Sequence, residues 1–474
     1  MMTQAQTLEI LKTGANVFLS GEPGSGKTHT IREYVRYLRD RGIEPAITAS
    51  TGIAATHIGG MTIHSWSGIG IKNYLDKYSL DRIASTEHVV KRVRKTNVLI
   101  IDEVSMLPAR TLTMVNQVLR EIKQVPETFG GMQVVFVGDF FQLPPIINIQ
   151  KEEEENIIQL LPDEPAPRFA FDSPSWARAK LIVCYLSEQH RQDDVEFLSI
   201  LSAIRRNTFS YDHMKRIETR KTSLENVPKN TPKLFSHNID VDRINHDMLK
   251  SLPGDEFNFP MESRGAMPII LALKKSCLSP ENLCLKTGAV VMFTKNNLRE
   301  RFVNGTLGVV TGFDTSARHP IVRTNSGNRI IVEPMEWSVE ENGKVRAQIT
   351  QFPLRLAWAI TVHKSQGMSM DEAIMDLSQV FEYGQGYVAL SRVRRLSGLH
   401  LLGANERAFL VDPFVLEKDE LFRNASGEAE KVFGNLPKAE LAQLQKDFVI
   451  NSGGSFEAAR VKTKPRKFRR AKIW

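Results

Sequence analysis

Four short apolar runs in the first third of the chain alternate with glycine-rich or polar segments. They are Asn16–Leu19, Ala46–Ala49, Val98–Ile101 and Val134–Val137. Each has the length of a buried strand. After the first run, residues 29–40 place Ile31, Val35 and Leu38 at helical spacing. Alternating strands and helices predict an α/β fold around a parallel sheet.

The segment that follows the first predicted strand is rich in glycine. Residues 21–28 match the phosphate-binding pattern G-x-x-x-x-G-K-[ST] in full. A chance match is the alternative, but a strand before and a helix after the loop are the context that this pattern requires. Lys27 can then reach the β- and γ-phosphates, and the Thr28 hydroxyl can ligate Mg²⁺. We predict nucleotide binding through Gly21, Gly24, Ser25, Gly26, Lys27 and Thr28.

A glutamine precedes this loop. Gln4 lies just before Leu8, Ile10 and Leu11, so a short helix should hold it near the loop that begins at Gly21. A side-chain amide can form paired hydrogen bonds with the edge of adenine. The alternative is a solvated surface residue.

Two acids end the third predicted strand. Asp102 and Glu103 directly follow the apolar run 98–101. In a phosphoryl-transfer site, one such carboxylate holds Mg²⁺ and the next orients and deprotonates the attacking water. We assign these roles to Asp102 and Glu103, with a polar turn as the alternative.

Polar segments follow the other strands too. Thr51 lies after the second strand, and residues 59–70 combine glycines, hydroxyls and His64, which suits a loop gripping a phosphate backbone or a compact surface loop. After the fourth strand, Gln142 can sense a γ-phosphate and Phe140 can touch a base. The acidic run 151–155, with the prolines after it, predicts an exposed excursion.

Composition adds modest limits. The 474 residues suffice for two to four domains, with 42% hydrophobic and 24% charged residues. We expect no membrane span or signal peptide, because no run of about 18 apolar residues occurs. Three cysteines without a C-x-x-C pair argue against structural zinc. A net charge of +8 hints at a polyanionic partner.

The pattern changes between residues 288 and 348. Short alternating strands around Val290–Phe293, Gly308–Val310, Ile321–Val322 and Ile330–Val332 are separated by Asn-Gly and Asn-Ser-Gly turns. This pattern predicts a small β-barrel inserted in the second half of the chain.

Several motifs together resemble those of superfamily-one helicases. In order they are Gly21–Thr28, Thr48–Ala55, Leu99–Met106, Gly138–Pro145, Glu188–Gln192, Thr361–Met368 and Gly384–Arg392. Phe129–Gln133 resembles the signature of the Pif-one (petite integration frequency) family of 5′→3′ DNA helicases, of superfamily one group B. The resemblance covers roughly residues 1–412.

The resemblance implies roles for further residues. In that family two RecA-like lobes close on ATP and Mg²⁺; Arg191 and Arg392 match the arginine fingers, and Gln142 and Gln385 the γ-phosphate contacts. The single-strand contacts that it implies are Thr51, His64, Phe140, His363, Lys364 and Ser365.

The resemblance also implies a domain plan. Residues 1–185 form RecA-like domain 1A, with a wedge subdomain 1B within about 56–78. Residues 186–287 and 349–412 form RecA-like domain 2A, and residues 288–348 form an SH3-like domain 2B. The remainder, 413–474, is a C-terminal extension with a helix near Pro437–Asp447 and a basic tail from Arg460.

The expected function is ATP-dependent 5′→3′ translocation on single-stranded DNA, in DNA repair, recombination, replication or telomere-type maintenance. Forked, tailed or quadruplex DNA and RNA–DNA hybrids are the implied substrates of a monomer, located in the cytoplasm with the nucleoid if the source is bacterial. Two alternatives stay open. One is a RecD-like helicase subunit of a recombination nuclease, and the other is a nucleotide-switch ATPase that does not translocate.

Overall fold

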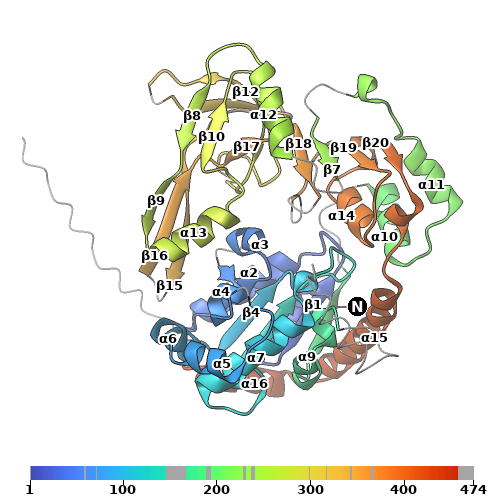
Figure 1. Ribbon diagram of the computed structural model, residues 1–474. Coiled ribbons are helices and arrows are strands. Elements are labelled where there is room, and N and C mark those ends of the chain that lie inside the picture. Colours follow the sequence, from blue (N-terminus) through green and yellow to red (C-terminus); the bar gives the residue numbers. More distant parts are fainter. Residues whose placement is uncertain are drawn as a thin grey trace, which may run out of the picture.

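The computed structural model has two α/β lobes joined to a mainly β-stranded insertion (Figure 1). It describes residues 2–57, 60–70, 72–145, 167–187, 194–227, 231–235, 241–297, 299–316, 318–341, 344–362, 365 and 368–456. Among the helices of these residues, none combines the length and apolar character needed to cross a membrane.

The first lobe is built on a six-stranded parallel sheet. Its order is β3 (Met61–Thr62), β2 (Ala46–Ala49), β4 (Val98–Asp102), β5 (Gln133–Val137), β1 (Val17–Gly21) and β6 (Ile182–Leu186). The four predicted strands are therefore confirmed as β1, β2, β4 and β5. Val17 and Leu19 of β1 pack on one face and Phe18 on the other, because successive side chains of a strand point to opposite faces.

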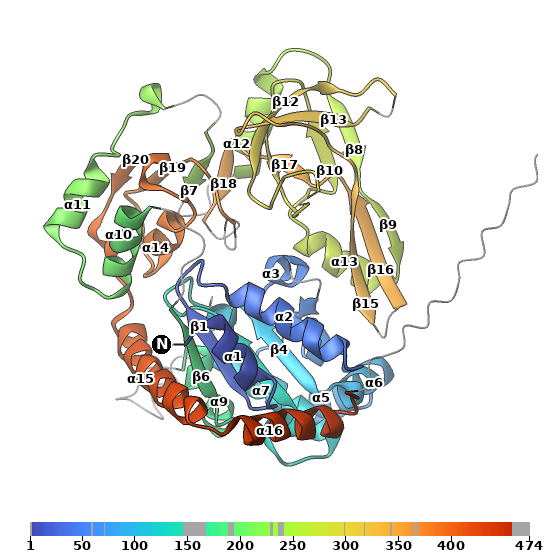
Figure 2. The ribbon, with the colours of Figure 1, turned by 180° about the vertical axis from the view of Figure 1, so that it is seen from behind.

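Helices cover both faces of this sheet (Figure 2). On the Val17 side lie α1 (Gln4–Leu11) and α2 (Lys27–Arg39), which confirms the predicted helix after the phosphate loop. On the Phe18 side lie α7 (Ala109–Lys123) and α9 (Pro174–Arg178). Further helices among the described residues of this lobe are α3 (Gly52–His57), α4 (Ile63–Ser67), α5 (Lys77–Ala84) and α6 (Glu87–Lys95).

The second lobe has a smaller parallel sheet. Its order is β18 (Ala359–Thr361), β7 (Lys233–Phe235), β19 (Ala373–Leu377) and β20 (Leu399–Ala404). Its helices are α10 (Val195–Arg205), α11 (Tyr211–Glu218), α12 (Val241–Ser251) and α14 (Gln385–Leu390).

The insertion is antiparallel. Five strands form one sheet: β14 (Arg329–Ile331), β13 (Pro320–Thr324), β12 (Leu307–Phe313), β11 (Val290–Phe293) and β17 (Leu354–Leu356). Three more form a long ribbon: β15 (Met335–Glu341), β16 (Lys344–Gln351) and β9 (Glu262–Gly265). β8 (Phe257–Pro260) pairs with β10 (Asn282–Leu285), and α13 (Met267–Ser276) packs on the ribbon. Because β9 pairs with β16, strands before residue 288 belong structurally with the insertion.

The C-terminal extension returns to the first lobe. α15 (Pro413–Gly434) packs on the edge strand β6, where the Tyr185 N–H donates to Ser426 Oγ at 3.0 Å. α16 (Lys438–Asn451) then runs below α1 and α2 (Figure 2). Its Val449 is fully buried in an apolar cluster that includes residues of both helices. The expected helix near Pro437 is thus present, whereas α15 was not expected. The basic tail lies outside the described residues.

Candidate functional site

The phosphate loop connects β1 to α2 through three glycines with positive φ. These are Gly21 (147°), Gly24 (88°) and Gly26 (90°), conformations that side chains with a Cβ rarely adopt. A Cβ at Gly26 would overlap the side-chain amide of Gln4, whose Nε2 donates to Ser25 O at 3.4 Å. The predicted proximity of Gln4 to the loop is therefore observed.

Lys27 lies in the mouth of the loop. Its Nζ donates to the carbonyl oxygens of Gly21 (2.7 Å) and Glu22 (3.1 Å), so the backbone satisfies it. Burial lowers the pKa of Lys27, an effect that the nearby Asp139 carboxylate opposes. A phosphate that replaced these carbonyls would place a negative charge beside the ammonium group and so stabilise its protonated form.

Thr28 and Asp102 line one cavity of about 380 Å³ beside α2. Burial raises the pKa of Asp102, which means that its charge lacks full solvation. A hydroxyl and one carboxylate fit Mg²⁺, which takes few protein ligands and completes its shell with phosphates and water. The described residues include no cluster of three or more His, Cys, Asp or Glu that could hold a metal ion.

Glu103 follows at the end of β4 in a left-handed conformation with φ 52°. Its N–H donates to Asp102 Oδ1 at 2.8 Å, and Ser50 Oγ donates to its carbonyl at 2.7 Å. Burial and, next in size, the charge of Asp102 raise the pKa of Glu103 to about 7, although Lys27 and Arg392 oppose this increase. A carboxyl group with this pKa suits a general base near neutral pH.

Two glutamine segments from different lobes meet at Gly384. Gln142 follows β5 and is 8% exposed, and its Nε2 donates to Asp139 Oδ2 at 3.4 Å. Gln385 begins α14 and is 2% exposed. A Cβ at Gly384 would lie 2.7 Å from Phe141 O and 2.9 Å from Gln142 O. The lobes therefore touch at the segments that carry the two predicted γ-phosphate contacts.

Arg392 is buried just after α14. Its guanidinium donates to Val388 O (2.8 Å), Ser391 Oγ (2.6 Å) and Ser365 O (3.3 Å). It also lowers the pKa of Glu103, so it lies within electrostatic reach of that acid across the lobes. This position is compatible with the predicted arginine finger.

The predicted DNA contacts on the first lobe lie near the insertion. Thr51 is half-buried, and its Oγ1 accepts from Ala54 N at 3.2 Å. His64 is half-buried and lines a cavity of about 540 Å³ between the first lobe and the insertion, and burial lowers its pKa. The opposite wall includes Leu273 and Arg346. The roles of Thr51 and His64 in binding DNA stay predictions.

Two other expected contacts do not fit this structure. Phe140 is 5% exposed, and its ring packs against the rings of Phe18, Phe169, Phe171, Trp176 and Phe422, with centroids 4.7 to 6.1 Å away. Ser365 is fully buried, and its hydroxyl donates to Val362 O. Both side chains are therefore buried in the arrangement described here. Arg191, His363 and Lys364 lie outside the described residues.

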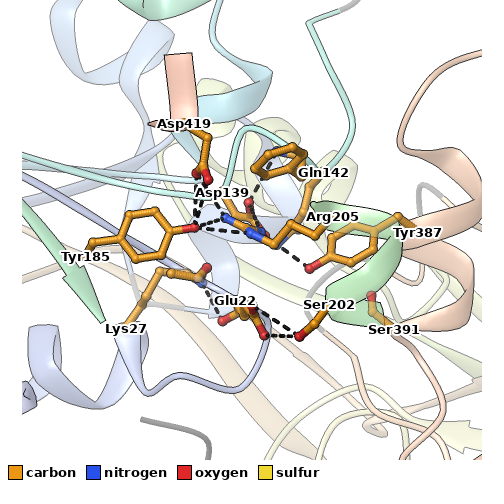
Figure 3. A network of polar contacts seen from close by, with 12 residues as sticks. Glu22, Lys27, Asp139, Gln142, Tyr185, Ser202, Arg205, Tyr387, Ser391 and Asp419 are labelled. Carbon is orange, nitrogen blue, oxygen red and sulfur yellow. Dashed lines mark hydrogen bonds and ion pairs between the residues drawn. The ribbon is translucent and has the colours of Figure 1, made fainter. Parts of the chain in front are cut away.

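A buried polar cluster beside the loop was not predicted (Figure 3). Arg205 of α10 pairs with Asp139, and Ser202 Oγ of the same helix donates to the Glu22 carboxylate at 3.2 Å. A signal was available, because Arg205 continues the apolar stripe of Phe197 and Leu201 at four-residue spacing.

Two α/β lobes that meet beside a phosphate loop, with an Asp–Glu pair at the end of a parallel strand, are typical of the RecA-like helicase class. The model of the family "PIF1-like helicase" matches residues 3–210. The ATP-dependent DNA helicase Pif1 of Psychrobacter is 41% identical, over 97% of this chain and 76% of its own length. The chain belongs to the Pif1 helicase family and is an ATP-dependent DNA helicase, which confirms the resemblance.

Solved structures agree. Unliganded Pif1 from Bacteroides matches with a TM-score of 0.76 at 30% identity, covering 90% of this chain and 98% of that one. The same Bacteroides protein bound to single-stranded DNA has equal identity and coverage but a TM-score of 0.59. The arrangement described here is thus closer to the Bacteroides Pif1 structures without DNA, including one with ADP-AlF4 at a TM-score of 0.77, than to this DNA-bound one.

Proposed function

We propose that this helicase uses MgATP to translocate 5′→3′ on single-stranded DNA and to unwind tailed or forked duplexes, with quadruplexes and RNA–DNA hybrids as further substrates. The observation that carries the proposal is the meeting of the two lobes at Gly384, beside both candidate γ-phosphate contacts. Nucleotide binding at that junction would change how the lobes sit, which is how ATP can drive movement along DNA.

The nucleotide roles follow from the geometry. Gln4 would contact adenine, and Lys27 would leave the carbonyls of Gly21 and Glu22 for the β- and γ-phosphates. Thr28 and Asp102 would hold Mg²⁺, which neutralises charge that develops on the phosphate oxygens.

The hydrolytic roles involve both lobes. Glu103 would accept a proton from the attacking water. Gln142 and Gln385 would contact the γ-phosphate, and Arg392, with Arg191, would stabilise the charge of the transition state.

We assign DNA backbone contacts to Thr51 and His64 on the first lobe and to His363 and Lys364 on the second. The antiparallel insertion corresponds in this proposal to the SH3-like subdomain 2B, and the segment near residues 56–78 to the wedge 1B. Biological roles in DNA repair, recombination or replication, and action as a monomer in the cytoplasm, belong to the same proposal.

Strand displacement tests the proposal. Duplexes with only a 5′ or only a 3′ single-stranded tail are incubated with MgATP, and a Lys27→Ala variant serves as the control. We expect unwinding of the 5′-tailed duplex alone and ATP hydrolysis stimulated by single-stranded DNA. Unwinding of only the 3′-tailed duplex would exclude 5′→3′ translocation. ATP hydrolysis that single-stranded DNA does not stimulate would exclude a motor that moves on DNA.

A further inference from the structure

Arg205 lies at a junction of three parts of the chain. It ends α10 in the second lobe and is 1% exposed. Its Nη1 donates to Asp139 Oδ1 at 2.6 Å, and its Nη2 donates to the Tyr185 hydroxyl at 2.6 Å, both in the first lobe. Nη2 also pairs with Asp419 Oδ1 of α15 at 3.5 Å. One guanidinium therefore connects both lobes and the C-terminal extension (Figure 3).

The cluster around Arg205 is balanced in charge. Arg423 of α15 donates to Asp419 Oδ2 at 2.6 Å and to the Tyr185 hydroxyl at 2.7 Å. Two guanidinium groups thus face two carboxylates, those of Asp139 and Asp419. Buried charges persist when they are paired and hydrogen-bonded, so this arrangement holds Arg205 in one orientation.

That orientation bears on the nucleotide contacts of both lobes. Asp139 Oδ1 accepts a hydrogen bond from Arg205, and Asp139 Oδ2 accepts one from the side-chain amide of Gln142. The guanidinium lies 4.2 Å from the ring centroid of Phe141, the residue before Gln142. Nη1 also donates to the Tyr387 hydroxyl at 3.4 Å, on the helix that begins with Gln385. Arg205 therefore contacts the immediate supports of both glutamines.

We propose that Arg205 is a positioning residue for ATP hydrolysis, and that Asp419 of α15 sets its orientation, so that the C-terminal extension adjusts turnover. The inference rests on the proposed roles of Gln142 and Gln385. Arginine is required because its planar group donates to Asp139, Tyr185 and Tyr387 in different directions, whereas a lysine ammonium on a flexible stem cannot reach all three.

The test compares Arg205→Lys with Arg206→Lys, a matched control at the next, exposed position. Steady-state ATP hydrolysis is measured at saturating single-stranded DNA. We expect Arg205→Lys to lower kcat by about 10-fold to 10²-fold with KM for ATP little changed, because misplaced groups slow the chemical step more than binding. Affinity for ADP–aluminium fluoride should fall in parallel with kcat, and affinity for ADP should not.

Asp419→Asn tests the part played by α15. The substitution keeps the shape of the side chain but removes its charge. The weaker hydrogen bond to Arg205 should lower kcat by about threefold. In the double variant Arg205→Lys/Asp419→Asn the loss should equal that of Arg205→Lys alone, because both changes act through one group. If Arg205→Lys does not fold, kcat and the two nucleotide affinities of Asp419→Asn decide the question.

Specific results would overturn the inference. A lower melting temperature with unchanged kcat would make Arg205 a purely structural residue. If the fold-losses in kcat of the two single variants multiply in the double variant, Asp419 does not act through Arg205. A wild-type chain without DNA-stimulated hydrolysis would instead refute the proposed function, so the two failures are distinguishable.

Discussion

At the scale of single residues, Glu103 combines backbone strain with a shifted pKa. A left-handed conformation costs a residue with a Cβ roughly 1–2 kcal/mol. It persists because Ser50 holds the carbonyl and Asp102 accepts from the N–H. Strain of this kind is found where a side chain must be aimed, here toward the region between Lys27 and Arg392 that perturbs its pKa.

Glu103→Gln should therefore remove the base and little else. The amide keeps the size of the carboxyl group but cannot take a proton, so we expect turnover of ATP to fall by at least about 10²-fold. Binding of MgATP, measured by titration, should persist. Glu121→Gln, at an exposed position of α7, is the control. Hydrolysis at the wild-type rate in Glu103→Gln would show that another group is the base.

Gly384 offers a second test with an internal control. Gly384 and Gly42 share φ values of 80° and 81°, but a Cβ at Gly42 would meet no atom within 4 Å. Gly42→Ala should cost only the conformational strain of about 1–2 kcal/mol. Gly384→Ala should cost about 1–3 kcal/mol more through overlap with the carbonyls of Phe141 and Gln142.

Denaturant unfolding measures the stability of the Gly384→Ala and Gly42→Ala variants, and steady-state ATP hydrolysis measures their activity. Because the overlap pushes the lobes apart at the candidate γ-phosphate contacts, Gly384→Ala should also lower kcat, while Gly42→Ala should not. Equal behaviour of the two variants would mean that the lobes do not need this close contact.

At this scale the position of a residue can be predicted where structure is local. Asp102 ends the predicted apolar strand and Glu103 follows it, as expected, and their roles in holding Mg²⁺ and activating water stay predictions. The burial of Phe140 was not expected, because the aromatic residues that bury its ring, such as Trp176 and Phe422, come from distant parts of the sequence. The pair of Asp139 and Arg205 was missed for the same reason.

At the scale of elements, apolar runs located β1, β2, β4, β5 and β11 because buried strands have little polar content. They did not reveal α15. Its buried residues are Val415, Asp419 and Ser426, of which two are polar, and its apolar contacts are made by partly buried residues such as Phe414, Phe422 and Phe433. Packing of Phe422 against Phe18 and hydrogen bonds to β6 and to the Arg205 cluster hold α15 in place, and these partners lie far from α15 in the sequence.

The docking of α16 can be tested with neighbouring residues. Val449 is fully buried against α1 and α2, and Ile450 is 54% exposed. Val449→Ala should lower the free energy of unfolding by about 2 kcal/mol through lost burial and a cavity. Ile450→Ala should change it by less than about 0.5 kcal/mol. Denaturant titrations measure both, and equal small effects would show that α16 is not part of the core of the first lobe.

At the scale of the whole molecule, the insertion covers the candidate DNA surface of the first lobe. The cavity of about 540 Å³ has Thr62, His64 and Arg92 on one side and α13 and the β15–β16 ribbon on the other. A Pif1 relative matches this arrangement better when unliganded than when bound to single-stranded DNA, with TM-scores of 0.76 and 0.59. The sequence indicated both parts but not how they face each other.

We therefore expect single-stranded DNA to move α13 away from the first lobe, because a nucleic acid backbone needs the space that the insertion now covers. Fluorophores on cysteines at Glu87 of α6 and Leu271 of α13, both exposed, report the separation by energy transfer. Cys277 and Cys284, which are partly exposed, are replaced by serine in this variant. Transfer should fall on addition of DNA.

A control pair within the first lobe, Glu87 and Arg120 of α7, should keep its transfer efficiency, because a rigid lobe moves as one body. The same samples are titrated to saturation by fluorescence anisotropy of labelled DNA, so that binding is established independently. If DNA binds and the Glu87–Leu271 transfer is unchanged, the insertion does not cover the DNA path, and the strand must cross the lobes elsewhere than past His64.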